Sequence, residues 1–174
     1  MDDMLDEILF ENIYTDTEDL MAEQYKKLFT SYRRLWVPIY SVLSVVFLLY
    51  VFLFGGLTNW LFLLISIAYL TYCCIRHRIA ARQYMKNVSK FYENTIPETV
   101  HSFSGDIIYS VFGNQTFHVP LAKVDILTET DHLLILCIGK NYRMTLKKDS
   151  FTKGTYPEFL AFLRTKCPSL KIPE

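Results

Sequence analysis

LWVPIYSVLSVVFLLYVFLFGGLTNWLFLLISIAYLTYCCI occupies residues 35–75, and this stretch decides the fold because it contains no charged residue. A single helix of this length would measure about 60 Å, twice the roughly 30 Å hydrocarbon thickness of a bilayer. Gly55 and Gly56 lie at its middle, where the chain can leave helical geometry. The sequence therefore predicts a transmembrane hairpin with spans at about 35–54 and 57–75. A buried hairpin in a soluble protein is the alternative, but the remaining chain is too short to cover two helices that are apolar on every face.

Basic residues flank this stretch on both sides, whereas the turn between the spans carries no charge. The flanking bases are Lys26, Lys27, Arg33 and Arg34 before it, and Arg76, Arg78 and Arg82 after it. The positive-inside rule therefore predicts a multi-pass protein of the cell (inner, cytoplasmic) membrane with both termini in the cytoplasm. Pro38 is expected in the first turn of the first span, where its missing N–H costs little. The residues expected at the membrane interfaces are Trp36, Tyr40, Trp60, Tyr69, Tyr72, Arg33, Arg34, Arg76 and Arg78.

Several classes of function are disfavoured by what the sequence contains. The spans carry no ionisable Asp, Glu, Lys, Arg or His, which disfavours transport. Because 18 basic and 18 acidic residues cancel, no nucleic-acid partner is expected. The acidic first 25 residues do not fit a signal peptide. The four histidines and four cysteines show no metal-ligand spacing, and nucleotide and hydrolase motifs are absent from the sequence. We therefore expect no metal, no cofactor and no enzymatic activity, with the cysteines reduced.

The segments beside the hairpin are predicted to be mainly helical. Within an acidic N-terminal segment, 1–34, residues 7–14 are a candidate short strand, and Thr15-Asp16-Thr17-Glu18 fits a capping box that would start a helix near Asp16. The apolar stripe of this helix fits packing on the soluble domain or, alternatively, lying on the membrane. After the hairpin, 76–98 is expected to be a cytoplasmic continuation helix and linker that ends near Pro97.

From Thr99 the pattern changes to alternation with a period of two. Short β-rich runs are separated by turn residues, which predicts an antiparallel meander. The expected strands are 100–103, 106–112, 116–119, 124–128, 133–138 and 142–146. A second capping box at Thr155-Tyr156-Pro157-Glu158 predicts a final helix ending at Cys167-Pro168. The fold class expected is thus an α+β membrane protein, with a cytoplasmic antiparallel β-sheet domain, 99–174, closed by a C-terminal helix.

Two segments, HVPLAKVDILTETDHLLIL (His118–Leu136) and LKKDSFTKGTYPEFLAFL (Leu146–Leu163), resemble the YcxB-like family of bacterial membrane proteins. Members pair two adjacent spans with a C-terminal domain similar to bacterial pleckstrin-homology folds. Leu146 departs from the pattern where the family often has Pro, and Leu121 departs where an aromatic residue is common. The resemblance implies a pleckstrin-homology-like domain and carries no known activity. The residues that fit are Lys147, Lys148, Phe151, Gly154, Glu158, Phe159, Phe162 and Leu163.

The expected function is a membrane-anchored cytoplasmic interaction or regulatory module that binds a protein or peptide, in addition to the lipid bilayer, through an exposed sheet edge. The alternative is anionic-lipid sensing or self-immunity against membrane-active peptides. A monomer and a dimer both remain open. The candidate headgroup- or partner-binding residues form a basic run, whose other interpretation is a solvated edge and loop: Lys140, Arg143, Lys147, Lys148 and Lys153.

Overall fold

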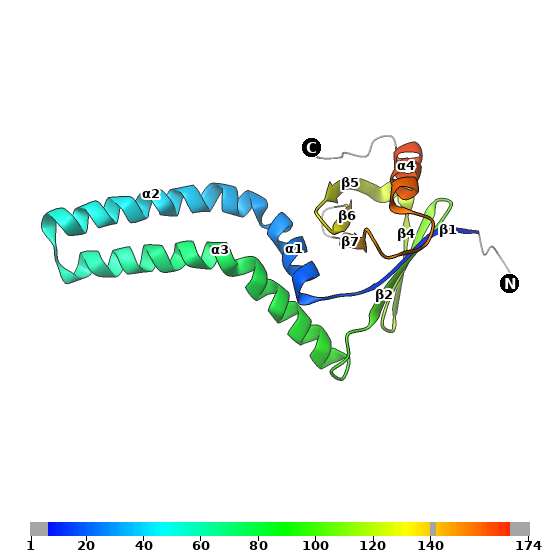
Figure 1. Cartoon of the computed structure of the whole chain (residues 1–174), viewed down its shortest axis with the longest axis horizontal. Coiled ribbons are helices and arrows are strands. Elements are labelled where there is room, and N and C mark those ends of the chain that lie inside the picture. Colours follow the sequence, from blue (N-terminus) through cyan, green and yellow to red (C-terminus); the bar gives the residue numbers. More distant parts are fainter. Residues whose placement is uncertain (1–6, 140–141, 168–174) are drawn as a thin grey trace. The chain divides into compact units, whose positions relative to one another are not determined.

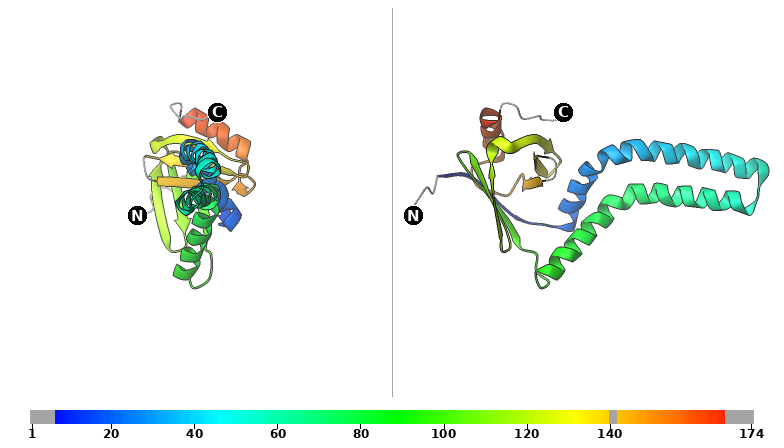
Figure 2. Two further views of the ribbon diagram at one scale, coloured as in Figure 1. Left: turned by 90° about the vertical axis from the view of Figure 1, so that its left-hand side faces the viewer. Right: turned by 180° about the vertical axis from the view of Figure 1, so that it is seen from behind.

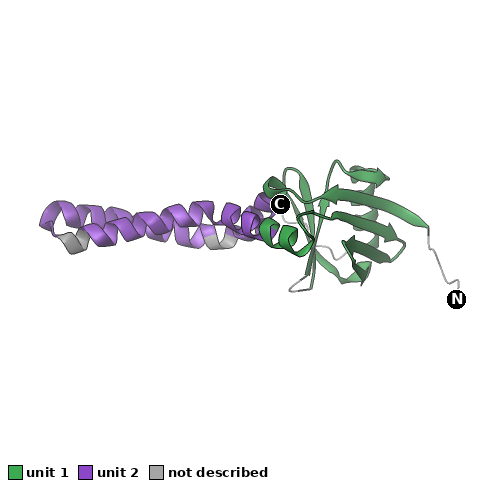
Figure 3. Ribbon diagram, turned by 90° about the horizontal axis from the view of Figure 1, so that it is seen from below, with its two compact units in different colours: residues 1–20, 85–174 green, residues 21–84 purple. Residues whose placement is uncertain are grey.

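The computed structural model describes residues 7–139 and 142–167 of the 174-residue chain. The chain divides into two compact units, which Figure 3 colours separately. One unit runs from Met21 to Tyr84 and contains the helical hairpin. The other combines the segments before Met21 and after Tyr84 and contains the strands and the last helix. The α+β class and the antiparallel pairing expected from the sequence are confirmed.

Two long helices form the hairpin. Helix α1, Glu18–Leu28, leads into α2, Thr30–Phe54, which is followed by α3, Leu57–Phe91. Helices α2 and α3 run side by side in opposite directions (Figures 1 and 2). They are joined at Gly55 and Gly56, whose φ angles of 61° and 91° favour glycine. The turn therefore lies where the sequence predicted it.

Both helices are long and apolar enough to cross a bilayer, over Arg33–Phe54 and Trp60–Phe91. In the most apolar 18-residue stretch of each helix, only 6% is buried in the first helix and 17% in the second. The core helix of a soluble protein would be mostly buried. Large apolar side chains such as Phe52 and Leu53 are 86% and 69% exposed. An aqueous solvent would not favour such a surface.

The two helices meet along a narrow seam. The hydroxyl oxygens of Ser44 and Ser66 lie 2.5 Å apart and share a hydrogen bond. The rings of Tyr40 and Tyr69 are 4.1 Å apart between centroids. Ser66 is buried in this seam. Small and aromatic side chains therefore fix the register of the hairpin.

The helix predicted near Asp16 is present as α1, but the predicted place of Pro38 and the predicted cap at Thr15 were wrong. Helical hydrogen bonds continue from α1 into α2, with the Phe29 N–H bonded to the Tyr25 carbonyl at 2.8 Å. Because α2 begins at Thr30, Pro38 lies in the helix interior rather than in a first turn. At the start of α1, the Leu20 N–H donates to the Thr17 hydroxyl at 3.3 Å, so Thr17 caps the helix. Thr15 instead ends a strand and pairs with Glu98.

The strands form two antiparallel sheets rather than one meander. The first has the order β4-β3-β2-β1-β8 and the second the order β5-β6-β7. The N-terminal strand β1 joins β2 along Ile8–Thr15, so this sheet draws on residues far from 99–174. Strand β8 was not foreseen. The bounds are β1 Ile8–Thr15, β2 Glu98–Ser104, β3 Ile107–Phe112, β4 Gln115–Pro120, β5 Val124–Glu129, β6 Leu133–Ile138, β7 Tyr142–Lys147 and β8 Phe151–Lys153.

Helix α4, Tyr156–Lys166, packs its apolar face into the core shared by the two sheets (Figure 1). Phe159 and Leu163 are fully buried there, beside Phe103 and Leu136. The Glu158 carboxylate accepts hydrogen bonds from the Thr155 N–H at 2.9 Å and from its hydroxyl at 2.7 Å. The predicted C-terminal helix and its start are thus confirmed.

Candidate functional site

The two sheets have four outer edges, and the edge of β7 is closed by side chains of β1. The Asn12 amide donates to the Lys147 carbonyl at 2.8 Å and accepts from the Lys147 N–H at 3.2 Å. The Tyr14 hydroxyl donates to the Thr145 carbonyl at 2.8 Å. Asn12 and Tyr14 are two residues apart on β1, so their side chains lie on the same side of the strand. They therefore occupy backbone groups that a further strand would need.

Strands β5 and β8 are protected in other ways. The register of β5 against β6 shifts between Val124 and Ile126, and such a bulge twists an edge away from new partners. Asp125 and Glu129 add negative charge to β5. Strand β8 spans only three residues, Phe151–Lys153. Neither strand offers a long, regular edge.

Strand β4 is the unprotected edge among the strands described. Its six residues, Gln115–Pro120, carry no Asp, Glu, Lys or Arg, and all except Val119 are exposed. Phe112 of β3 and Gln115 of β4 flank a two-residue turn, so they form a hydrogen-bonded pair with each other. By alternation, the backbone N–H and C=O of Thr116 and His118 point outward. These groups are available to an added strand.

The side chains of β4 give this edge a mixed character. Phe117 is 40% exposed and lies 6.1 Å from the Tyr142 ring, between centroids. His118 is exposed, with its ring 4.9 Å from that of Tyr109. Pro120 ends the strand and has no N–H to donate. The edge thus offers backbone hydrogen bonds beside exposed rings.

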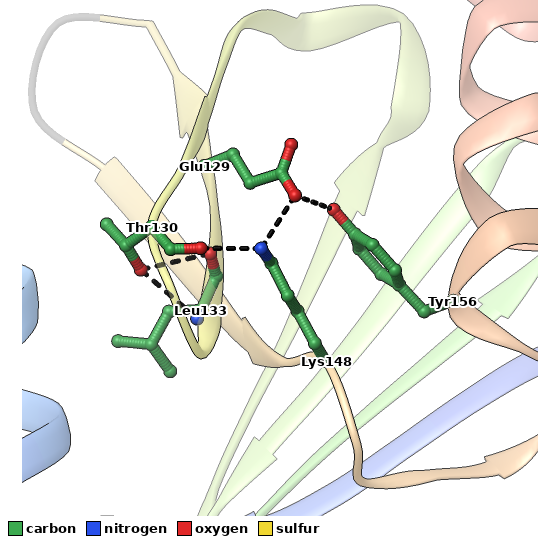
Figure 4. Close-up of polar contacts among 5 residues, drawn as sticks. All are labelled: Glu129, Thr130, Leu133, Lys148 and Tyr156. Atoms are coloured by element: carbon green, nitrogen blue, oxygen red, sulfur yellow. Dashed lines mark hydrogen bonds and ion pairs between the residues drawn. The ribbon is translucent and has the colours of Figure 1, made fainter.

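Lys148, one of the predicted binding residues, is held in a network that Figure 4 shows. Its ammonium lies 2.6 Å from the Glu129 carboxylate and donates to the Thr130 carbonyl. The Tyr156 hydroxyl donates to the same carboxylate oxygen at 2.7 Å. Hydrogen bonds from Lys148 and Tyr156 lower the pKa of Glu129. Burial, followed by the bond to Glu129, raises the pKa of Tyr156. The network joins β5 to the start of α4.

The other predicted basic residues are distributed over both sheets. Lys147 pairs with Asp149 at 3.4 Å. Arg143 is exposed on β7, and Lys153 is exposed on β8 of the other sheet. Lys140 lies outside the described residues. Two of the five bases are therefore already paired with carboxylates, so they do not form one free cationic patch.

A buried polar row crosses the inner face of the five-stranded sheet. Asn12 pairs in register with His101, which pairs with Ser110, and all three are buried. Neither ring nitrogen of His101 has a hydrogen-bond partner of good geometry among the described residues. Burial lowers the pKa of His101 to about 4, although the nearby Thr145 carbonyl favours its protonated form. His101 is thus neutral at physiological pH.

The predicted interface residues all lie in the hairpin unit. Trp60 and Tyr72 are 51% and 42% exposed, whereas Tyr40 and Tyr69 contact each other in the seam. Trp36 lies 5.9 Å from Tyr40 between ring centroids. Arg33 is half-buried and Arg34 and Arg78 are exposed. The guanidinium carbon of Arg76 lies 4.5 Å from the centre of the Phe29 ring.

Sequence reasoning missed the β4 edge because a single meander was predicted, in which β4 would pair with β5, whereas β5 begins a second sheet. The absence of charge in Gln115–Pro120 was the available signal. Among the described residues, no group of three or more His, Cys, Asp and Glu side chains is placed to hold a metal ion. Comparisons of the chain with protein families, curated proteins and solved structures give no match.

Proposed function

We propose that this protein is a membrane-anchored, non-catalytic interaction module. The hairpin inserts in the cytoplasmic membrane from the cytoplasmic side, and the β-domain binds an extended segment of a partner protein along β4. The observation that carries the proposal is the contrast between β4 and the other three edges. Natural proteins protect sheet edges with charge, bulges or covering side chains, and β4 has none of these except its terminal Pro120.

The exposed surface of the hairpin supports its insertion. Its apolar side chains are turned outward along both helices, and burying them in lipid is favourable. Within the described part of the spans, the polar groups Ser44 and Ser66 are bonded to each other. The basic residues before and after the spans support the cytoplasmic orientation of both ends.

An added strand would gain both hydrogen bonds and side-chain contacts. The outward backbone groups of Thr116 and His118 would pair with it in the same pattern that joins β4 to β3. Phe117 and the Tyr142 ring would flank alternate side chains of the segment. Extended peptides bind other domains by this kind of β-augmentation.

The architecture also supports, as a proposal, a pleckstrin-homology-like domain of the YcxB-like kind. Two antiparallel sheets share one core, and a single C-terminal helix covers it. Phe159 and Leu163, which carry part of the resemblance, are the residues that α4 buries.

Lipid sensing by the β-domain has less support. Lys148 and Lys147 would have to exchange the carboxylates of Glu129 and Asp149 for lipid phosphates. Peptide immunity finds no specific observation in its favour. Recognition of a protein segment at β4 is therefore the function that the geometry supports best.

The test is photo-crosslinking of the full-length protein in its native membranes. A photoreactive residue at His118 should give a discrete adduct, whereas one at the exposed Arg164 on α4 should not. Adding Thr116→Pro should abolish the adduct because it removes an outward N–H without breaking the β3–β4 bonds. Thr116→Ala keeps this N–H and should preserve the adduct. Loss of the adduct in both variants, or in neither, would refute β4 as the binding edge.

A further inference from the structure

The base of the hairpin carries a cationic groove that the proposed function does not use. It has a volume of about 340 Å³ and is lined by Thr30, Arg33, Arg34 and Val37 on the first two turns of α2. Its lining thus combines two guanidinium groups with one apolar side chain, whereas the Thr30 hydroxyl donates to the Lys26 carbonyl at 3.0 Å. Guanidinium groups form paired hydrogen bonds with phosphate oxygens, which suits them to phosphate binding.

An apolar groove follows directly along the same helix. It has a volume of about 460 Å³ and is lined by Pro38, Ile39, Val42, Leu43 and Val46. Residues four apart on a helix form a continuous row on its surface. Thr30, Arg34, Pro38, Val42 and Val46 form such a row, so the cationic groove leads into the apolar one.

The charges of this groove are available to a ligand. Within the described part of the chain, neither Arg33 nor Arg34 forms an ion pair with a carboxylate. Lys26, Arg33 and Arg78, from three different helices, all act electrostatically on His77, so positive charge is concentrated here. Helix α3 contains no Asp or Glu that could offset it, and the acids of α1, Glu18, Asp19 and Glu23, precede its basic last turn. The local field therefore favours an anion.

Pro38 adds an acceptor to the same place. A regular helix would bond the N–H of residue 38 to the Arg34 carbonyl, but proline has no N–H. The freed carbonyl can accept a hydrogen bond from a headgroup hydroxyl. The groove thus presents both phosphate-binding cations and an acceptor.

We propose that Arg33 and Arg34 bind the phosphate of an anionic glycerophospholipid, with one acyl chain lying along the row Pro38-Val42-Val46. A phospholipid fits because its phosphate and its apolar chain are covalently joined, as the two grooves are continuous. Free phosphate would use only the cationic part. The site rests on the proposed insertion of the hairpin, and it extends that proposal by assigning a lipid class to one face of α2.

The experiment measures quenching of Trp36 fluorescence by brominated lipids in the full-length protein with Trp60→Phe. Trp36 is three residues from Arg33 on the same helix, so it reports lipid near the groove. The protein is reconstituted in phosphatidylcholine vesicles that contain increasing fractions of phosphatidylglycerol brominated near the headgroup end of its acyl chains. A parallel series uses brominated phosphatidylcholine. We expect half-maximal quenching at a roughly thirtyfold lower fraction of phosphatidylglycerol, the scale set by two interfacial bases.

The double variant Arg33→Gln/Arg34→Gln should lose this preference. The matched control Lys86→Gln/Lys90→Gln removes the same charge from exposed positions of α3 and should retain the preference. Inorganic phosphate, compared with chloride at equal ionic strength, should leave the curves unchanged. Equal quenching by both lipids, equal effects of the two double variants, or displacement by inorganic phosphate would overturn the site. No quenching by either lipid would instead refute insertion, and with it the proposed function.

Discussion

Replacing Asn12 by Ala should strongly destabilise the β-domain. Asn12 is fully buried, and its amide makes two hydrogen bonds, at 2.8 and 3.2 Å, with the backbone of Lys147. Each backbone group left without a partner costs about 1–3 kcal/mol when buried. Because Lys147 is half-buried and water can reach part of it, we expect a loss of about 2–4 kcal/mol. That loss is a large fraction of the ~5–15 kcal/mol that stabilises a typical domain.

Cys167 provides the assay. It is buried in the domain core, and burial is the main reason that its pKa is raised, so its labelling by a thiol reagent requires opening of the domain. The full-length protein in detergent is pulsed with reagent at increasing urea, and the label on the Cys167 peptide is quantified by mass spectrometry. Asn87→Ala, at an exposed site of α3, is the control and should change stability by less than about 0.5 kcal/mol. If Asn12→Ala matched this control, the closure of the β7 edge by β1 would be refuted.

Three further predictions concern the same domain. Because the pKa of His101 falls from 6.5 unfolded to about 4 folded, the unfolded chain binds more protons between these values. His101 should therefore lower stability progressively as pH falls from 6.5 to about 4. His101→Asn should remove that part of the pH dependence, and titration near 6.5 of the imidazole NMR signal that is missing in this variant would contradict it. Tyr156→Phe should cost about 1 kcal/mol through the lost bond to Glu129, and ultraviolet titration should lose one of its late-ionising tyrosines. Gly154→Ala should cost about 1–3 kcal/mol, because φ is 74° and the new Cβ would meet the Phe10 ring; unchanged Cys167 protection would argue against this strain.

Local patterns predicted the elements of this fold well. Gly55-Gly56 marked the hairpin turn, and alternation from Thr99 placed β2 to β7 within a few residues of their observed bounds. The capping box at Thr155 and Glu158 placed the start of α4 because the contacts involved are local.

Long-range pairing could not be predicted in the same way. Nothing local to Ile8–Thr15 indicates that it pairs with both β2 and β8, which lie on the other side of the hairpin in sequence. The candidate site at β4 was hidden as well, because nothing local indicates that β5 begins a second sheet instead of pairing with β4. The position of Pro38 within its helix was predicted wrongly for a different reason. The apolar stretch marks where a membrane could lie, whereas α2 begins earlier, at Thr30.

The central claim is that the hairpin crosses the membrane and leaves the β-domain in the cytoplasm. Accessibility of single cysteines tests it most directly, after the four native cysteines have been replaced. Phe54→Cys lies at the hairpin turn and Thr152→Cys on β8, and both sites are exposed. With a membrane-impermeant thiol reagent, Phe54→Cys should be labelled in right-side-out vesicles and Thr152→Cys only in inverted vesicles. Labelling of both positions from the same side would contradict the account.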